Sequence, residues 1–61
     1  MNYSLTLLTP REVADLLCIK EHTLAVWRNT KRYNIPHVKV GSKVRYRIAD
    51  VEAFIASRII N

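Results

Sequence analysis

The chain has 61 residues, of which 49% are hydrophobic, with one Gly and two Pro. A chain of this length has a small core, so we expect one domain over residues 1–61, with its core about 7–57 and little room for an enclosed active site. Ten Lys and Arg against five Asp and Glu give a net charge of +5 and a pI of about 9.9, which favours a nucleic-acid binder over an enzyme.

The charges are divided unevenly along the chain. Residues 22–48 contain no Asp or Glu, and all five acidic residues lie on either side of this segment. Because a merely solvated surface usually mixes both signs, the segment predicts a positively charged binding surface. Its seven basic residues are Arg28, Lys31, Arg32, Lys39, Lys43, Arg45 and Arg47.

The cysteine content and the hydropathy pattern indicate a cytoplasmic protein. Cys18 is the only cysteine, so no disulfide can form within the chain. No apolar run approaches the roughly 18 residues of a membrane span, and residues 1–8 lack the features of a signal peptide. We therefore expect a reducing compartment and no membrane partner.

A first helix is predicted over residues 10–17. Thr9 and Glu12 have the spacing of a capping box, in which each satisfies a free backbone N–H of the other, and Pro10 suits the first helical position. The helical spacing predicts that this helix buries a stripe made of Val13, Leu16 and Leu17.

A second helix is predicted over residues 21–29, after a three-residue turn. Its N-cap residue, Lys20, has no side-chain acceptor and is a poor cap. At about 100° per residue, Leu24 and Trp27 fall on one side and face the core, which makes Trp27 a core residue rather than a base-stacking one. The opposite side is small or polar and could enter a groove; it contains His22, Ala25, Val26 and Asn29.

Residues 34–48 have the pattern of a β-hairpin. Apolar residues occupy even positions, basic residues occupy odd positions, and Gly41-Ser42 marks the turn. Since a two-residue loop would mix the two sets on each face, we expect a three-residue loop or a bulge at Gly41. The hairpin would then have an apolar inner face and a basic outer face. Arg47 could instead pair with an acidic residue near the last helix.

The last helix is predicted to begin near Ala49-Asp50. Val51, Phe54 and Ile55 have helical spacing and should cover the core. Ile59 and Ile60 continue the pattern, and they could be packed, frayed or in contact with another chain.

These elements together predict a mainly α fold with a small β-hairpin, a winged helix-turn-helix with a two-stranded antiparallel wing and a C-terminal helix. The second helix would enter the major groove, which is about 12 Å wide, and the wing would reach phosphates or the adjacent minor groove. The expected partner is therefore double-stranded DNA. The candidate contacts are Lys20, His22, Thr23, Ala25, Val26, Arg28, Asn29, Lys31, Arg32, Lys39, Ser42, Lys43 and Arg45.

Catalysis and metal binding have little support in the sequence. Cys18, His22 and His37 are only three candidate metal ligands, and their spacing is unlike that of a zinc finger. Glu12 and Asp15 would lie on an exposed helix face, and Glu12 already serves in capping. We expect no catalytic residues, no cofactor, no metal and no small-molecule substrate.

Residues 7–17, Leu-Leu-Thr-Pro-Arg-Glu-Val-Ala-Asp-Leu-Leu, resemble the opening of excisionase-type, MerR-like and AlpA-like helix-turn-helix proteins. The resemblance continues through Thr23, Leu24 and Trp27 and through 35–36, 38–41, 44–47 and 50–54, so that it covers about 7–57. The family commonly has Gly at the position of Cys18 and Ser at that of Lys20, and many of its members have a more basic wing tip.

The resemblance implies an architectural, non-catalytic role in a bacterium or a phage-infected host. One role is a phage or mobile-element excisionase, a recombination directionality factor that binds beside an attachment site, bends DNA and directs a tyrosine or serine integrase. The other is a small AlpA-like transcriptional regulator. A single small module buries little surface, so we expect cooperative self-association of several copies on direct repeats of DNA, or help from a larger protein. A protein-interaction inhibitor that binds no DNA is the alternative from another class.

Overall fold

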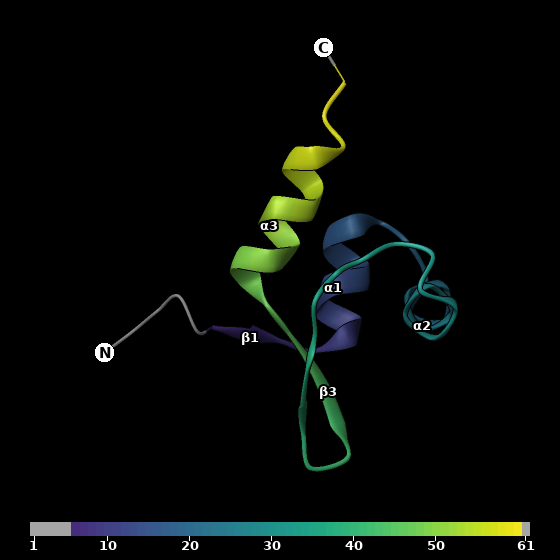
Figure 1. Cartoon of the computed structure of the whole chain (residues 1–61), viewed down its shortest axis with the longest axis vertical. Coiled ribbons are helices and arrows are strands. Elements are labelled where there is room, and N and C mark those ends of the chain that lie inside the picture. Colours follow the sequence, from purple (N-terminus) through teal and green to yellow (C-terminus); the bar gives the residue numbers. More distant parts are fainter. Residues whose placement is uncertain (1–5, 61) are drawn as a thin grey trace.

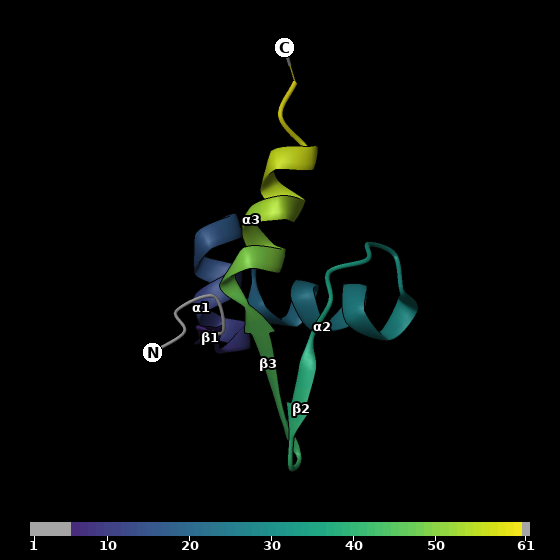
Figure 2. The ribbon, with the colours of Figure 1, turned by 60° about the vertical axis from the view of Figure 1, so that its left-hand side comes forward.

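The computed structural model describes residues 6–60, which contain three helices and three strands. The helical body holds α1 and α2, and the hairpin of β2 and β3 extends from it in the direction opposite to α3 (Figures 1 and 2). In chain order, the elements are β1 (Leu7–Leu8), α1 (Pro10–Leu17), α2 (Glu21–Thr30), β2 (Val38–Val40), β3 (Lys43–Arg47) and α3 (Ile48–Ser57).

Helix α1 has the predicted bounds and the predicted capping box. The backbone N–H of Glu12 donates to Thr9 Oγ1 at 3.1 Å, and the backbone N–H of Thr9 donates to Glu12 Oε1 at 2.8 Å. The helix ends at Cys18, which has a left-handed conformation with φ 57°. Residues 18–20 then form the predicted three-residue turn into α2.

The core is a single cluster to which the three helices, the sheet and the loop after α2 all contribute. Its buried members are Val13, Leu24, Ile35, Tyr46 and Val51, and the partly buried residues packed against them are Leu8, Leu17, Ile19, Trp27, Val44 and Phe54. The burial of Leu24 and the packing of Trp27 confirm that this side of α2 faces inward.

The predicted stripe on α1 was wrong at one position, because Leu16 is 55% exposed. Val13 and Ala14 are buried and Leu17 is half-buried, so the inward face of α1 is centred between Val13 and Ala14. Leu16 lies about 100° around the helix from that centre and points to solvent.

The sheet has the strand order β1-β3-β2, with β3 in the middle. Strand β1 pairs antiparallel with β3 through Leu7 opposite Arg47 and Leu8 opposite Tyr46. The backbone N–H of Ile48 also donates to the carbonyl of Thr6 at 3.0 Å. The predicted two-stranded wing is therefore part of a three-stranded sheet, because the segment before α1 adds a strand that was not predicted.

The hairpin turn differs from the prediction of an odd-numbered loop or a bulge. Val40 pairs directly with Lys43, so that Gly41 and Ser42 form a two-residue loop. Gly41 has φ 65° and Ser42 has no positive φ, which is the pattern of a type II′ turn. This turn twists in the same sense as the strands and accepts Gly at its first central position, so the local turn geometry fixes the register.

The register mixes apolar and basic residues on both faces of the wing, so the predicted apolar inner and basic outer faces were wrong. Directly paired residues lie on the same face of a sheet, which places Val38 with Arg45 and Lys39 with Val44. The core receives Val44 and Tyr46 from β3. Val40, at the tip, is 57% exposed.

Helix α3 begins at Ile48, slightly earlier than predicted. Arg47 Nε donates to Asp50 Oδ2 at 2.6 Å, so that of the two alternatives for Arg47 the structure shows the pairing with an acidic residue near the last helix. Val51 is buried, but Ile55 is 39% exposed, so its predicted core role was wrong. The body ends near the first turns of α3, and the rest of the helix extends beyond it (Figure 2).

The apolar residues after α3 do not pack against this core. Ile59 is 64% exposed and Ile60 is 94% exposed. Of the three predicted alternatives for these residues, packing within the chain is therefore excluded.

Candidate nucleic-acid interface

Helix α2 presents a narrow outer face on which no apolar side chain is larger than Val. Leu24 is buried, and Trp27 is half-buried with its ring in edge contact with Tyr33 at a centroid distance of 4.7 Å. On the other side of the helix, the predicted contact residues His22, Val26 and Asn29 are exposed, whereas Thr23 and Ala25 are half-buried. The exposed face is therefore slim enough to enter a DNA major groove.

The two ends of α2 carry exposed lysines. Lys20 is the N-cap residue and makes no side-chain capping bond, as expected. Lys31 is the C-cap residue, with φ 56°, and its backbone N–H donates to the carbonyl of Trp27. One turn earlier, Arg28 is half-buried, and its Nη1 donates to Tyr46 Oη at 3.4 Å. Arg28 is thus tethered to the central strand of the sheet.

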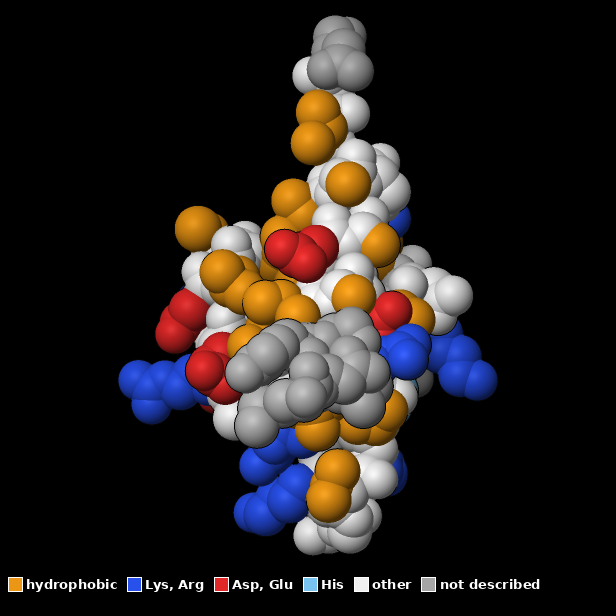
Figure 3. Space-filling view, turned by 90° about the vertical axis from the view of Figure 1, so that its left-hand side faces the viewer, with side chains coloured by type: hydrophobic (Ala, Val, Ile, Leu, Met, Phe, Trp, Pro, Cys, Tyr) orange, Lys and Arg blue, Asp and Glu red, His pale blue; other side chains and the backbone are white. Residues whose placement is uncertain are grey.

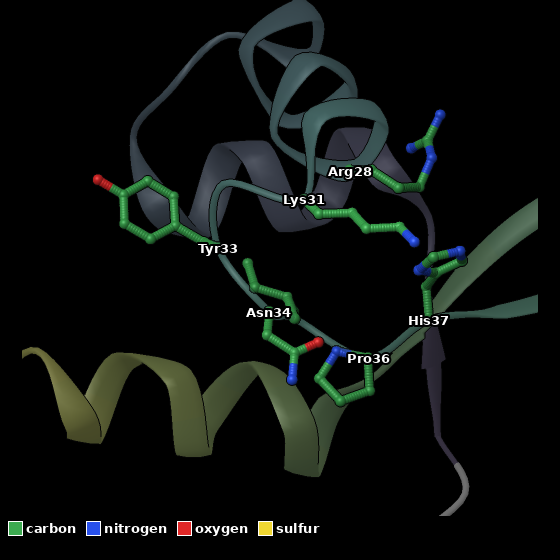
Figure 4. A pocket seen from close by; sticks show the side chains of 7 residues that line it. Arg28, Lys31, Tyr33, Asn34, Pro36 and His37 are labelled. Atoms are coloured by element: carbon green, nitrogen blue, oxygen red, sulfur yellow. The ribbon is translucent and has the colours of Figure 1, made fainter.

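Arg32 stands apart from the other predicted cations of this region. Its guanidinium lies over the Tyr33 ring, 5.5 Å from the centroid, and Arg58 lies over the same ring at 4.9 Å. A hydrogen bond and the charge from Arg32, helped by the charge of Arg58, hold the pKa of Tyr33 below its usual range. Since Tyr33 points away from Arg28 and Lys31 (Figure 4), the structure does not bring Arg32 together with them.

The wing displays its cations on both faces. Lys39, Ser42 and Lys43 are exposed, and the register places Lys43 on the face opposite to Lys39. Arg45 is half-buried and its Nη1 donates to the carbonyl of Val44 at 2.7 Å.

Arg45 also acts on the start of α1. The hydrogen bonds with the backbone and side chain of Thr9 hold the pKa of Glu12 below its usual range, and the charge of Arg45 lowers it further. The charge of Arg45 is therefore close enough to the start of α1 to act on Glu12.

Basic side chains gather toward the wing end of the molecule, whereas exposed apolar side chains occur along its whole length. In Figure 3, most Lys and Arg side chains lie in the lower half of the molecule, and hydrophobic side chains lie both over α3 and near the wing tip. The exposed apolar residues include Leu7, Leu16, Val26, Val40, Ile55, Ile59 and Ile60. The wing end is therefore basic, with an apolar residue, Val40, exposed at its tip.

His37 is a basic residue that was not among the predicted contacts. It is exposed at the base of β2, with its ring centroid 6.0 Å from that of Tyr46, and it lines one pocket together with Arg28 and Lys31. The signal that could have found it is its place in the alternating basic set of positions 37, 39 and 43.

Within residues 6–60, no group of three or more His, Cys, Asp and Glu side chains could hold a metal ion. In the same part of the chain, no helix has both the length and the apolar character needed to cross a membrane.

Two short helices joined by a three-residue turn, with a slim outer face on the second helix and a basic hairpin beside it, define a winged helix-turn-helix DNA-binding module. A family model described as a helix-turn-helix domain matches residues 7–59, and the chain belongs to this family. The resemblance to excisionase-type helix-turn-helix proteins is thereby confirmed, and the chain is a small DNA-binding protein of a non-catalytic family. Curated proteins and solved structures give no match.

Proposed function

We propose that this protein is an excisionase, a recombination directionality factor of a phage or mobile element. It would bind DNA beside an attachment site, bend the DNA and direct a tyrosine or serine integrase. The observation that supports the proposal is that α2, which has a slim outer face, is joined to the base of the basic wing by the Arg28–Tyr46 hydrogen bond and a shared pocket. A duplex docked on both elements is held at a major groove and at the neighbouring minor groove, which is how a small protein can impose a bend.

The exposed face of α2 is the part that would read bases. His22 and Asn29 can donate to or accept from base edges, and Val26 can contact a thymine methyl group. The cations at the ends of α2 and on the wing would contact phosphates, which position the protein without reading sequence.

The size of the module indicates that several copies act together. One module of this kind buries roughly 600–1,000 Å² of surface on DNA, which is too little for high specificity alone. Exposed apolar residues such as Ile55 and Ile59 supply a surface for a neighbouring copy or for the integrase. Cooperative binding to direct repeats is therefore part of the proposal.

A gel-shift titration on fragments that carry the attachment region tests the DNA-binding step. Neutralising roughly four to six phosphates predicts a log-log salt slope near −4 to −5. Replacing His22 and Asn29 together by Ala should weaken specific binding, whereas the exposed α3 variant Glu52→Ala should bind at least as well as the wild type. An affinity that hardly changes with salt would contradict the proposal.

Circular-permutation gels and an excision reaction reconstituted with the cognate integrase test the architectural step. We expect a mobility that depends on the position of the site, and excision that requires the protein. Binding without a bend and without any effect on excision would exclude the excisionase role.

An AlpA-like transcriptional regulator is the second candidate, because the same α2 and wing surface would serve at a promoter. A promoter reporter in cells that lack the integrase separates the two roles. Regulation that persists without the integrase, together with no effect on excision, would favour the regulator.

A protein-interaction inhibitor is a further candidate, and the observation that favours it is the exposure of Ile59 and Ile60. In that role the basic wing would face an acidic protein surface. A complete lack of DNA binding at low salt would favour this candidate.

A further inference from the structure

A pocket of about 530 Å³ lies where the end of α2, the loop after it and the base of the wing meet (Figure 4). Figure 4 shows the side chains of Arg28, Lys31 and His37 on the same side of this pocket, and the side chain of Lys31 extends toward His37. Tyr33 points away from that side, and Asn34 points toward α3. The pocket therefore has one side made of nitrogen-bearing side chains.

The fold positions the basic residues of this pocket. Arg28 is tethered through Nη1 to the phenol of Tyr46, and Tyr46 is 1% exposed. His37 packs near the same Tyr46 ring. Lys31 is fixed at its backbone by the left-handed C-cap of α2. Arg28 and His37 are thus positioned against buried Tyr46, and the backbone of Lys31 is fixed between them in the sequence.

The chemistry of the pocket selects an anion. Arginine and lysine carry permanent positive charge near neutral pH and donate hydrogen bonds, and a histidine ring donates at least one. None of the described residues that line the pocket is acidic. The nearby Asp50 is engaged by Arg47 at 2.6 Å, so its charge is offset.

The position of the pocket between α2 and the wing identifies the source of the anion. A duplex that receives α2 in its major groove and the wing at the adjacent minor groove has one sugar-phosphate strand between these two grooves. That strand must cross the junction of helix and wing, where the pocket lies. A phosphate of this strand would therefore meet Arg28, Lys31 and His37 at the same time.

We propose that the pocket of Arg28, Lys31 and His37 is a binding site for the DNA phosphate that separates the two grooves. The site rests on the proposed DNA binding and adds to it a residue, His37, and a defined place for one backbone phosphate. Such a contact fixes the spacing between helix and wing on the duplex and contributes affinity that does not depend on sequence.

The test is fluorescence anisotropy with a labelled mixed-sequence duplex over a series of KCl concentrations. The variants are Lys31→Asn and His37→Gln. Asn suits the left-handed conformation at position 31, so this substitution removes the charge without straining the backbone. We expect each variant to weaken binding by about three- to tenfold, and Lys31→Asn to reduce the salt slope by about 0.9.

Matched controls separate a local contact from a change in net charge or a loss of folding. Arg11→Gln removes one positive charge from the exposed face of α1, away from the pocket, and should weaken binding less than Lys31→Asn does. Lys31→Arg should restore most of the affinity. Melting curves show which variants are folded, and His37→Asn replaces His37→Gln if the latter is unstable.

The wild type is also titrated with inorganic phosphate and monitored by amide NMR chemical shifts. This measurement distinguishes failure of the pocket proposal from failure of the proposed DNA binding. If folded pocket variants bind DNA as the wild type does, the pocket proposal is wrong while the proposed function stands. If the wild type binds no DNA but phosphate shifts the signals of Lys31 and His37, the pocket is an anion site and the DNA role fails. If neither ligand binds, both proposals fail.

Discussion

Arg28 Nη1 donates a hydrogen bond to Tyr46 Oη across a distance of 3.4 Å, and this bond joins α2 to the central strand of the sheet. Tyr46 is one of the most buried residues of the core, whereas Arg28 is half-buried at the edge of the proposed DNA surface. The core therefore determines the direction of a side chain that we expect to contact phosphate.

Replacing Tyr46 by Phe should separate this positioning role from packing. The ring remains in the core, so we expect the free energy of unfolding to fall by no more than about 1 kcal/mol, the typical value of one hydrogen bond. Without its tether, Arg28 must be ordered on binding, and the affinity for DNA should fall by roughly two- to tenfold. Urea unfolding and anisotropy measure the two effects.

Tyr46→Leu is the control, because it removes the ring as well as the hydroxyl. It should lose clearly more stability than Tyr46→Phe. Equal DNA affinity of the wild type and Tyr46→Phe would show that the hydrogen bond does not position Arg28 for binding.

The left-handed conformation of Cys18 predicts a stabilising substitution in the turn between α1 and α2. A residue with a Cβ pays roughly 1–2 kcal/mol in this conformation, and glycine does not. Cys18→Gly should therefore raise the free energy of unfolding by about 1 kcal/mol, after the greater flexibility of glycine in the unfolded chain is considered. Thermal and urea unfolding of the reduced protein provide the measurement.

Cys18→Ala is the matched control for this substitution, since it removes the thiol and keeps the Cβ. Its stability should be close to that of the wild type. If Ala stabilises the protein as much as Gly does, the thiol and not the backbone conformation is responsible.

The capping box of α1 predicts how stability changes at acid pH. The pKa of Glu12 lies below its ordinary value of 4.5 in the folded protein, mainly because of its hydrogen bonds with Thr9. A lowered pKa in the folded state means that the contribution of Glu12 is complete above about pH 4.5 and is lost as the pH falls further. The melting temperature should therefore fall less steeply below pH 4.5 in Glu12→Gln than in the wild type.

The neutral variant keeps a side-chain acceptor for the cap, so the comparison isolates the charge of Glu12. Asp15→Asn, on the same helix, is the control and should keep the steep acid dependence. Parallel pH profiles of the wild type and Glu12→Gln would argue against a role of this carboxylate.

The backbone conformation of Gly41 predicts that the wing turn is sensitive to substitution at this position. Its φ of 65° is unfavourable for other residues, although a Cβ at this position would meet no atom within 4 Å. Gly41→Ala should therefore cost about 1 kcal/mol through the backbone alone. The neighbouring Ser42→Ala should have little effect on stability, and amide chemical shifts of β2 and β3 would report any change of register.

The signals that predicted the fold well were local ones. The capping box at Thr9 and Glu12 fixed the start of α1, and helical spacing identified Leu24 and Trp27 as inward residues. The pairing of Arg47 with the last helix also depends on a short separation in sequence. Each of these features depends only on residues within one or two helical turns of one another. All the interacting residues can therefore be identified from a short stretch of sequence.

The features that sequence reasoning missed depend on partners distant in the chain or on a competition between signals. Two residues, Leu7 and Leu8, show no periodicity, so β1 becomes visible only when β3 is beside it. The alternation along the wing suggested an odd loop, but the turn at Gly41 determined the register instead. Leu16 and Ile55 are exposed because the packing direction of each helix is set by its neighbours.

The candidate site also has one part that could be predicted from the sequence and one part that could not. The outer face of α2 could be predicted from helical geometry, whereas the pocket combines residues from the end of α2 with His37 at the base of β2. No spacing rule relates these positions, because the loop between them determines how they meet.

The central position of β3 has a consequence for the way the protein would dock. A free hairpin of this length is marginally stable and would have to become ordered on contact with a duplex. Here β1 pairs with Tyr46 and Arg47 at the base of β3, and β2 pairs with residues 43–45. The base of the wing is therefore anchored in the sheet, and we expect only its distal part to lose freedom when it docks on a duplex. Because this anchor lies beside Tyr46, the partner of Arg28, we expect detachment of β1 to disturb the base of the wing and the α2 contact together.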